Sequence, residues 1–239
     1  MLRIDSFYSE SAEIISFVYC LYAERFGESF SKQTTDVIHW EGDYPISCPK
    51  RLNPEYDVDN KVFITSEKMR WCQIIYQLAH EFSHVAMGCY PNNEKLKWIS
   101  ECLCEAASIY ALKKSILFFE KRCPSYVKSV KEYIDNILIK SPTYTREKIK
   151  EFIYENIREL NEDPTEDAKE GRPRNDVIGK HWAKIIEEKE DGWSAIVLFS
   201  KIEDESMDEV AFLKEWFSKC RNDNERNFVR RITETILSN

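Results

Sequence analysis

The chain has 239 residues, of which 43% are hydrophobic and 13% aromatic, so it is long and apolar enough to bury a sizeable core and is not intrinsically disordered. Its formal charge of -8 at pH 7, with no basic block along the sequence, disfavours a nucleic-acid-binding protein, because such proteins need a positive surface. Only 6 glycines occur, and Glu, Lys, Ile and Leu are abundant, which together indicate a helix-rich protein.

The first elements along the chain are predicted to be a helix and a small sheet. Residues 9–26 carry apolar side chains at helical spacing and are followed by Gly27, which is typical of a helix with a glycine stop. Residues 35–66 are rich in β-branched and aromatic side chains and are interrupted by Pro, Gly and Asn, as expected for short strands. We expect these strands at 36–41, 44–48 and 61–65.

Two long helices are predicted to follow the strands. The first spans about 67–88, with Ser66 as its N-cap and Gly88 as its stop. A short loop then leads to a second helix at about 94–119.

The remainder of the chain is predicted to be helical. The periodic segments are 124–140, 145–160, 176–189, 192–201, 207–220 and 223–237. The polar segment 161–175 contains both Pro and Gly and therefore predicts a linker or loop. The expected architecture is an α+β fold: a domain at 1–160 with a small sheet and two long helices, then this linker, then a helical subdomain at 176–239 that packs on the first.

The location predicted for the protein is cytoplasmic. The N-terminus has no apolar run behind a basic start, so we expect no signal peptide. No uncharged apolar stretch is long enough to span a bilayer, so we expect no membrane association. The sequence has 8 cysteines but no C-x-x-C pair, which favours reduced, mostly buried thiols over a four-cysteine zinc site.

The first long helix contains the pattern H-E-x-x-H at His80, Glu81 and His84. Residues i and i+4 lie on the same face of a helix, so the two imidazoles can bind one metal ion, for which zinc is the best match. Zinc acidifies a bound water molecule, and Glu81 is then placed to accept its proton as a general base. The alternative is a helix that carries two ordinary histidines and no metal.

A catalytic zinc site needs a third protein ligand besides the two histidines. His39 and His181 lie far from the motif in sequence and lack the short spacing of sites with a third histidine. Glu101 and Glu105 are better candidates, because they are i, i+4 neighbours on the second long helix. Either one could be the ligand, and the other would then accept the N–H of a zinc-bound histidine or remain solvated.

The segment W-I-S-E-C-L-C-E at 98–105 extends the comparison to a known family. Together with the H-E-x-x-H motif, it resembles the gluzincin zinc peptidases, whose compact members carry a pattern close to W-L-x-E-G-L-A-E-Y. The resemblance covers about residues 60–112. It implies that Glu101 is the third zinc ligand and that Glu105 is the second acid of the pattern.

The sequence departs from this pattern at two cysteines and in its spacing. Cys102 and Cys104 stand where glycine and alanine are common in the family, and we interpret them as small residues that allow close helix packing. The alternative is a redox site or a different metal site. Sixteen residues separate His84 from Glu101, fewer than in the longer-spaced gluzincins, whereas twenty separate His84 from Glu105.

The resemblance implies a zincin-like fold and zinc-dependent hydrolysis of peptide bonds in a peptide or protein substrate. Strand 61–65 is expected to be a sheet edge beside the site, to which an extended substrate could add as a further strand. His181 is a candidate for stabilising the oxyanion formed during the reaction. Three alternatives remain: a peptidase that cleaves one regulatory protein, a non-catalytic module that uses the zinc fold for binding, and a helical interaction protein without metal.

Overall fold

The computed structural model describes residues 1–88, 96–139, 145–162, 172–202, 204 and 206–237. These residues form two compact units, which are treated separately below. The first comprises Met1–Cys89 and Ala107–Ile137, and the second comprises Tyr90–Ala106 and Leu138–Asn239. The predicted α+β class is confirmed, since one small mixed sheet accompanies a large majority of helical residues.

The sheet of the first unit has four strands in the order β1-β2-β4-β3. The strands are β1 (Leu2–Ile4), β2 (Thr35–His39), β3 (Ile46–Pro49) and β4 (Asn60–Ile64). The first three in the spatial order, β1, β2 and β4, are parallel, and β3 pairs antiparallel with β4. Three of these strands match the sequence-based prediction, whereas β1 was not predicted.

The position of β4 corrects the prediction for strand 61–65. We expected a sheet edge there, but β4 pairs with β2 on one side and with β3 on the other. A strand that is paired on both sides has no free backbone groups to offer an additional strand. Among the described residues, the outer strand on the β4 side of the sheet is β3.

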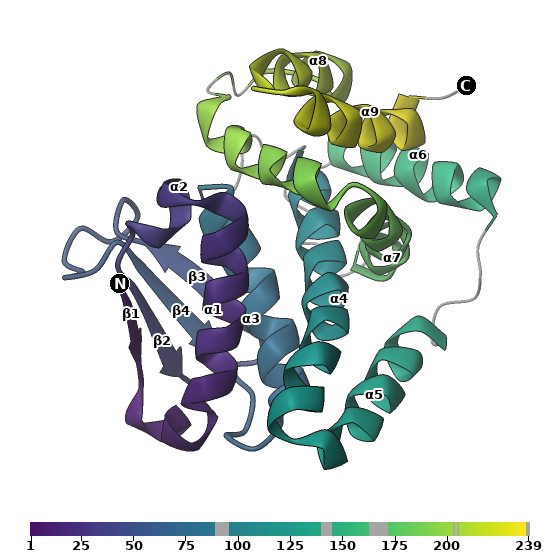
Figure 1. The fold of residues 1–239 in the computed structure, drawn as a ribbon. Helices are drawn as coiled ribbons and strands as arrows, with labels where there is room; N and C mark the ends of the chain where they lie inside the picture. Colours follow the sequence, from purple (N-terminus) through teal and green to yellow (C-terminus); the bar gives the residue numbers. More distant parts are fainter. Residues whose placement is uncertain (89–95, 140–144, 163–171, 203, 205, 238–239) are drawn as a thin grey trace. The chain divides into compact units, whose positions relative to one another are not determined.

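Helices α1 (Ala12–Phe26) and α3 (Trp71–Ala86) cover one face of this sheet (Figure 1). The alternation of burial along the strands explains this arrangement, since Val37, Val62 and Ile64 are fully buried on the covered face. The short helix α2 (Glu28–Ser31) adds Phe30 to an aromatic cluster between α1 and α3. Its other members are Tyr22, Phe26 and Phe82.

Helix α3 begins later than the sequence predicts. Ser66 was the expected N-cap, but the helix starts at Trp71 after Arg70. Ser66 instead donates its hydroxyl hydrogen to the Oε1 atom of Gln77, which also accepts the backbone N–H of Thr65 and of Ser66. The hydrogen bond between Ser66 and Gln77 therefore links the end of β4 to the middle of α3. The predicted stop is confirmed, since Gly88 follows the helix with a φ of 76°.

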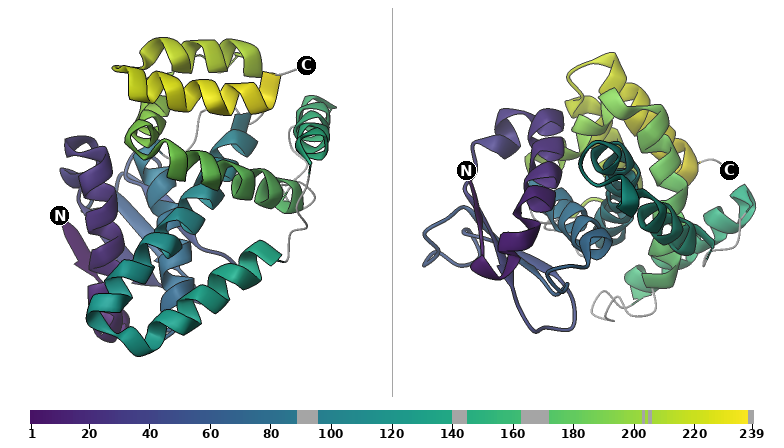
Figure 2. Two further views of the ribbon diagram at one scale, coloured as in Figure 1. Left: turned by 45° about the vertical axis from the view of Figure 1, so that its right-hand side comes forward. Right: turned by 60° about the horizontal axis from the view of Figure 1, so that its bottom comes forward.

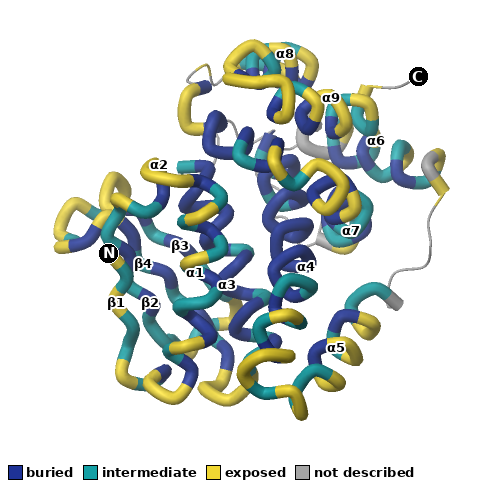
Figure 3. The backbone as a smooth tube through the Cα atoms, viewed as in Figure 1, coloured by how far each residue is buried: buried dark blue, intermediate teal, exposed yellow. Residues whose placement is uncertain are grey.

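Helix α4 (Lys97–Arg122) is continuous and contributes to both units. Its residues from Ala107 onward belong to the first unit, which ends at Ile137, near the end of α5 (Val127–Ile139). Nearly every residue from Trp98 to Leu112 is buried, as the dark tube of α4 shows in Figure 3. Such a helix has no solvated polar face over this length, so its polar side chains must find protein or ligand partners.

The second unit is helical, as predicted for the C-terminal half. It contains α6 (Arg146–Glu162), α7 (Arg172–Glu188), η4 (Glu190–Lys201), α8 (Glu209–Lys219) and α9 (Asp223–Leu237). Helices α8 and α9 pack side by side (Figure 2). Segment η4 is a 3-10 helix that lies against α9, and an added Cβ at its Gly192 would meet the carbonyl oxygen of Asn224 at 2.2 Å.

The predicted linker at 161–175 lies within the second unit. Residues 161–162 end α6, residues 172–175 begin α7, and 163–171 lie outside the described residues. The compact units therefore divide the chain elsewhere, because the first part of α4 groups with the later helices. Within the described part of the chain, no helix is both long and apolar enough to cross a membrane.

Candidate metal site

Helix α3 places the three residues of the H-E-x-x-H motif within one turn. The rings of His80 and His84 lie 5.0 Å apart between centroids, as i, i+4 neighbours on one helix face. His80 is half-buried, whereas Glu81 and His84 are only 3% and 1% exposed. The predicted zinc helix is thus a packed helix whose motif residues are held within the fold.

Hydrogen bonds of two buried hydroxyl groups connect α3 to α1 next to the motif. Tyr22 on α1 donates to the carbonyl oxygen of Ala79, and its hydroxyl lies 2.8 Å from that of Ser83. Ser83 also donates to the carbonyl of Ala79. Because Ala79 and Ser83 immediately precede the two histidines in sequence, these bonds fix the rotation of the helix about its axis.

A second contact sets the position of α4 along α3. The hydroxyl of Ser108 donates to the carbonyl oxygen of Tyr76 at 3.0 Å, and both residues belong to the first unit. His80 lies one turn beyond Tyr76, and Cys104 lies one turn before Ser108 on the continuous helix α4.

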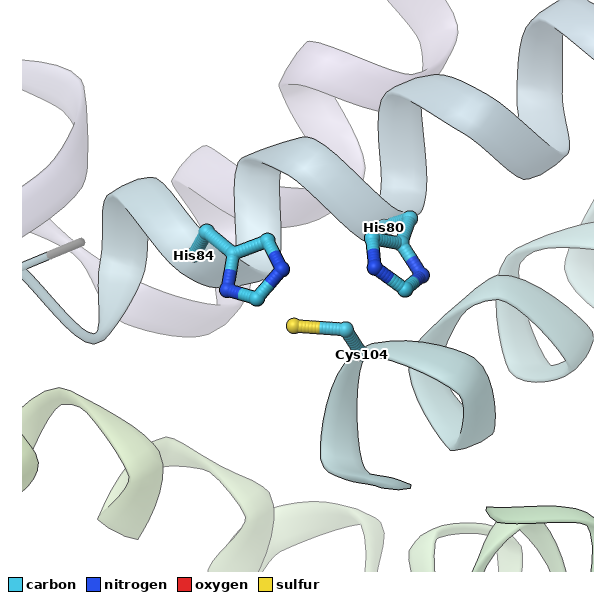
Figure 4. Close-up of side chains that lie close together, drawn as sticks. All are labelled: His80, His84 and Cys104. Carbon is cyan, nitrogen blue, oxygen red and sulfur yellow. The ribbon is translucent and has the colours of Figure 1, made fainter. Parts of the chain in front are cut away.

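Three potential ligand atoms converge at this point (Figure 4). One ring nitrogen from each of His80 and His84 and the Sγ atom of Cys104 all lie within 4.8 Å of one another. The thiol of Cys104 points toward the two imidazoles, and the residue is 0% exposed. Cys104 stands three residues before Ala107, where the part of α4 in the first unit begins.

The chemistry of this cluster fits a zinc ion. Zinc binds imidazole nitrogen at about 2.0–2.1 Å and thiolate sulfur at about 2.3 Å, in a tetrahedral arrangement. These bond lengths place neighbouring ligand atoms about 3.3–3.6 Å apart, a separation that small side-chain rotations would reach from the observed spread. Two imidazoles and one thiolate also leave one of the four positions open.

The other predicted site residues lie outside this cluster. Glu101 is half-buried, and Glu105 is buried on the following turn of α4. Their roles as third ligand and supporting acid stay predictions. An added Cβ at Gly179 of α7 would lie 2.6 Å from the Cβ of Glu105, so α7 and α4 approach each other closely within the second unit.

The two remaining histidines differ in their surroundings. His39 ends β2 and stacks on Phe7, with ring centroids 3.8 Å apart, and its Nδ1 lies 3.1 Å from the hydroxyl of Tyr8. These contacts explain the position of the His39 ring without a bound metal ion. His181 is half-buried on α7 in the second unit, and its predicted role with the oxyanion stays a prediction.

The charge of Glu81 acts on the outer strand of the sheet. Burial raises the pKa of the Cys48 thiol on β3, and the negative charge of Glu81 raises it further. Helix α3 packs against both β3 and β4. The carboxylate of the motif is therefore close enough to β3 for electrostatic interaction.

The sequence interpretation did not assign Cys104 to the metal. We interpreted it as a small packing residue, as buried cysteines commonly are, and gave a redox site or a different metal site as the alternative. A signal was nevertheless present, because Cys104 and Ser108 are i, i+4 neighbours and share the helix face that meets α3. Choosing that face over its neighbours required the bond between Ser108 and Tyr76, which the sequence does not reveal.

Comparisons with known proteins found no matching family model, no similar curated protein and no matching solved structure.

Proposed function

We propose that this protein is a zinc-dependent peptidase with a gluzincin-like site. The observation that carries the proposal is the convergence of His80 and His84 with a third ligand atom. Glu81 directly follows His80 in sequence, as the general base does in the H-E-x-x-H motif. The packed helix supports the same function, because a site that positions a reacting water needs ligands held within a narrow range of geometry.

Each motif residue has a distinct task in this proposal. His80 and His84 hold the metal, and zinc, when bound, polarises the peptide carbonyl and acidifies the attacking water. Glu81 accepts the proton of that water and then delivers it to the departing amine. Because Glu81 is only 3% exposed, its carboxylate is restrained by the surrounding protein.

The outer strand β3 supports an extended peptide or protein as the substrate. A segment in extended conformation can add to an outer strand through main-chain hydrogen bonds, with little preference for sequence. β3 packs against α3, and the pKa of its Cys48 responds to the charge of Glu81. A peptide bound along β3 would therefore lie beside the helix that carries the proposed general base.

The thiols are compatible with a cytoplasmic location, which we include in the proposal. The seven cysteines in the described part of the chain are all free. Free thiols persist in a reducing compartment, whereas secreted proteins commonly pair them.

Substituting the general base tests the proposed reaction. Glu81→Gln keeps the size of the side chain and removes no histidine, so we expect normal zinc content and a decrease in peptide hydrolysis of about 10²–10⁴-fold. The probe is a mixture of fluorogenic peptides together with an unfolded protein. Glu120→Gln, at an exposed position on α4, is the matched control and should retain full activity. Wild-type rates in Glu81→Gln would contradict the assigned role.

The burial of the cluster favours one second candidate, a non-catalytic zinc module. His84 and Cys104 are almost fully buried, and His80 is the one member of the cluster with substantial exposure. A zinc ion closed off by a fourth ligand would stabilise the fold without turnover. Stoichiometric zinc with no hydrolysis of any peptide or unfolded protein would favour this candidate, or a peptidase that acts on one specific regulatory protein.

A further inference from the structure

We propose that the third protein ligand of the metal is the thiolate of Cys104, in place of the carboxylate of Glu101 that the family resemblance implies. The inference rests on the metal binding of the proposed function but not on its peptidase activity. It assigns a two-histidine, one-cysteine site to this chain. Zinc, as a borderline-soft metal, suits imidazole and thiolate donors, whereas magnesium, calcium and manganese prefer oxygen.

The first step of the argument is the position of Cys104 relative to the two histidines. Its Sγ lies within 4.8 Å of a ring nitrogen of each histidine. Among the residues that the structure describes, His80, His84 and Cys104 form the group of three or more His, Cys, Asp or Glu side chains whose ligand atoms lie close enough together to hold one metal ion. Glu101 and Glu105 are described on the same helix and are not part of that group.

The second step is the hydrogen bond between Ser108 and Tyr76, which is independent of the cluster. This bond holds α4 against α3 at a fixed point within the first unit. One turn from each residue toward the motif leads to Cys104 and His80. Glu101 is three residues earlier on α4, about 4.5 Å further along the helix axis. The cysteine whose Sγ lies near both histidines is thus also the residue one turn from this contact.

The third step concerns charge and burial. A protonated thiol is a poor ligand, so metal binding requires the Sγ–H bond to break and releases one proton to the solvent. The sulfur keeps the electron pair and donates it to the metal. The thiolate then supplies the one negative charge that a carboxylate would supply in the family pattern. A short side chain that is 0% exposed also loses little conformational entropy when it binds.

X-ray absorption spectroscopy of the zinc-loaded wild-type chain tests the assignment without any mutation. Zinc–sulfur bonds of about 2.3 Å are resolved from zinc–nitrogen and zinc–oxygen bonds of about 2.0–2.1 Å. We expect one sulfur in the coordination shell. A shell of nitrogen and oxygen alone would overturn the proposal, as would a chain that binds no zinc.

Cobalt substitution then identifies which cysteine supplies the sulfur. Cobalt(II) bound to thiolate absorbs in the near ultraviolet through sulfur-to-metal charge transfer, whereas cobalt bound only by nitrogen and oxygen lacks this band. We expect Cys104→Ser to lose the band and to weaken metal binding by more than the roughly 10–100-fold typical of removing a supporting residue. Cys102→Ser is the matched control, because residues two apart on a helix face different directions, and it should keep the band.

Glu101→Gln separates the two candidate ligands. We expect this variant to keep the charge-transfer band and to bind cobalt within about 10–100-fold of the wild type, as expected when a residue near the metal is not itself a ligand. Loss of metal in Glu101→Gln with an unchanged band in Cys104→Ser would overturn the proposal. A sulfur-ligated metal without hydrolysis would leave this assignment standing and contradict the peptidase function. Hydrolysis by a chain whose zinc has no sulfur ligand would support the peptidase function and overturn this ligand assignment.

Discussion

The hydroxyl of Tyr22 on α1 lies 2.8 Å from the hydroxyl of Ser83 on α3, and both residues donate to the carbonyl oxygen of Ala79. Tyr22 and Ser83 are fully buried. The pair lies between α1 and α3, and its shared acceptor Ala79 and Ser83 itself each precede one histidine of the motif in sequence. Helix α3, which carries the two histidines of the proposed metal site, is thus held against α1 by hydrogen bonds as well as by apolar packing.

Removing the Tyr22 hydroxyl should weaken the fold measurably. Tyr22→Phe removes the Tyr22 donor from the buried carbonyl oxygen of Ala79 and the neighbouring hydroxyl from Ser83, so we expect the free energy of unfolding to fall by about 1–3 kcal/mol. Chemical denaturation of the metal-free protein measures this change. Tyr19→Phe is the control on the same helix, since its hydroxyl donates at 3.3 Å in a partly exposed position. An equal effect of the two substitutions would show that the buried pair has no special role.

Gln77 should contribute more to stability than its neighbour on the same helix. Its Oε1 accepts from the backbone N–H groups of Thr65 and Ser66 and from the Ser66 hydroxyl. Gln77→Ala leaves these buried and partly buried donors without that acceptor, so we expect a loss of about 2–3 kcal/mol in the free energy of unfolding.

The control for this prediction is Gln73→Ala, one turn earlier on α3 and partly exposed. We expect a change of less than about 0.5 kcal/mol, as is usual for partly exposed positions. Thermal or denaturant unfolding of both variants gives the comparison. Equal losses would mean that the link between β4 and α3 does not depend on Gln77.

The second unit contains a buried acid that should make stability depend on pH. Burial alone would raise the pKa of Glu225, but hydrogen bonds from Arg221 and from Ser194 outweigh it and hold this pKa below its ordinary value of 4.5. A carboxyl group with a lowered pKa in the folded state binds protons more weakly there than in the unfolded state. Its contribution to stability is therefore complete above pH 4.5 and is lost as the pH falls toward the folded-state pKa.

Comparison with a neutral variant measures this contribution. The wild type should be more stable than Glu225→Gln at pH 7, and the difference in unfolding free energy should shrink as the pH is lowered below about 4.5. Glu234→Gln, an exposed change on the same helix, should show a small difference at every pH. A difference between wild type and Glu225→Gln that is constant with pH would contradict the prediction.

The sequence predicts the elements of this fold better than their contacts. Helix α3 follows from its apolar periodicity and from Gly88, whereas its first residue was wrong because Ser66 bonds to Gln77 and does not cap the helix. The interior position of β4 depends on the strand order, which no local pattern encodes. Strand β1 has only three residues and is defined by its pairing with β2, more than thirty residues away.

In the candidate site, too, the sequence predicts positions on one helix better than contacts between helices. His80 and His84 could be placed together because they share one helix, and their spacing alone brings them to one face. Cys104 belongs to a different helix, and its place beside them depends on how α3 and α4 pack. The family pattern favoured the acidic residue one turn earlier, since it describes residue types and not the packing in this chain.

The zinc content of the chain, purified without added metal, is the measurement that tests the central claim most directly. We predict close to one zinc per chain in the wild type, and loss of most of it in His84→Ala, because two imidazoles from one helix form the core of the site. His39→Ala removes a histidine that stacks on Phe7 and should keep its zinc. A metal-free wild type, or a His84→Ala variant that keeps its full zinc content, would contradict the account.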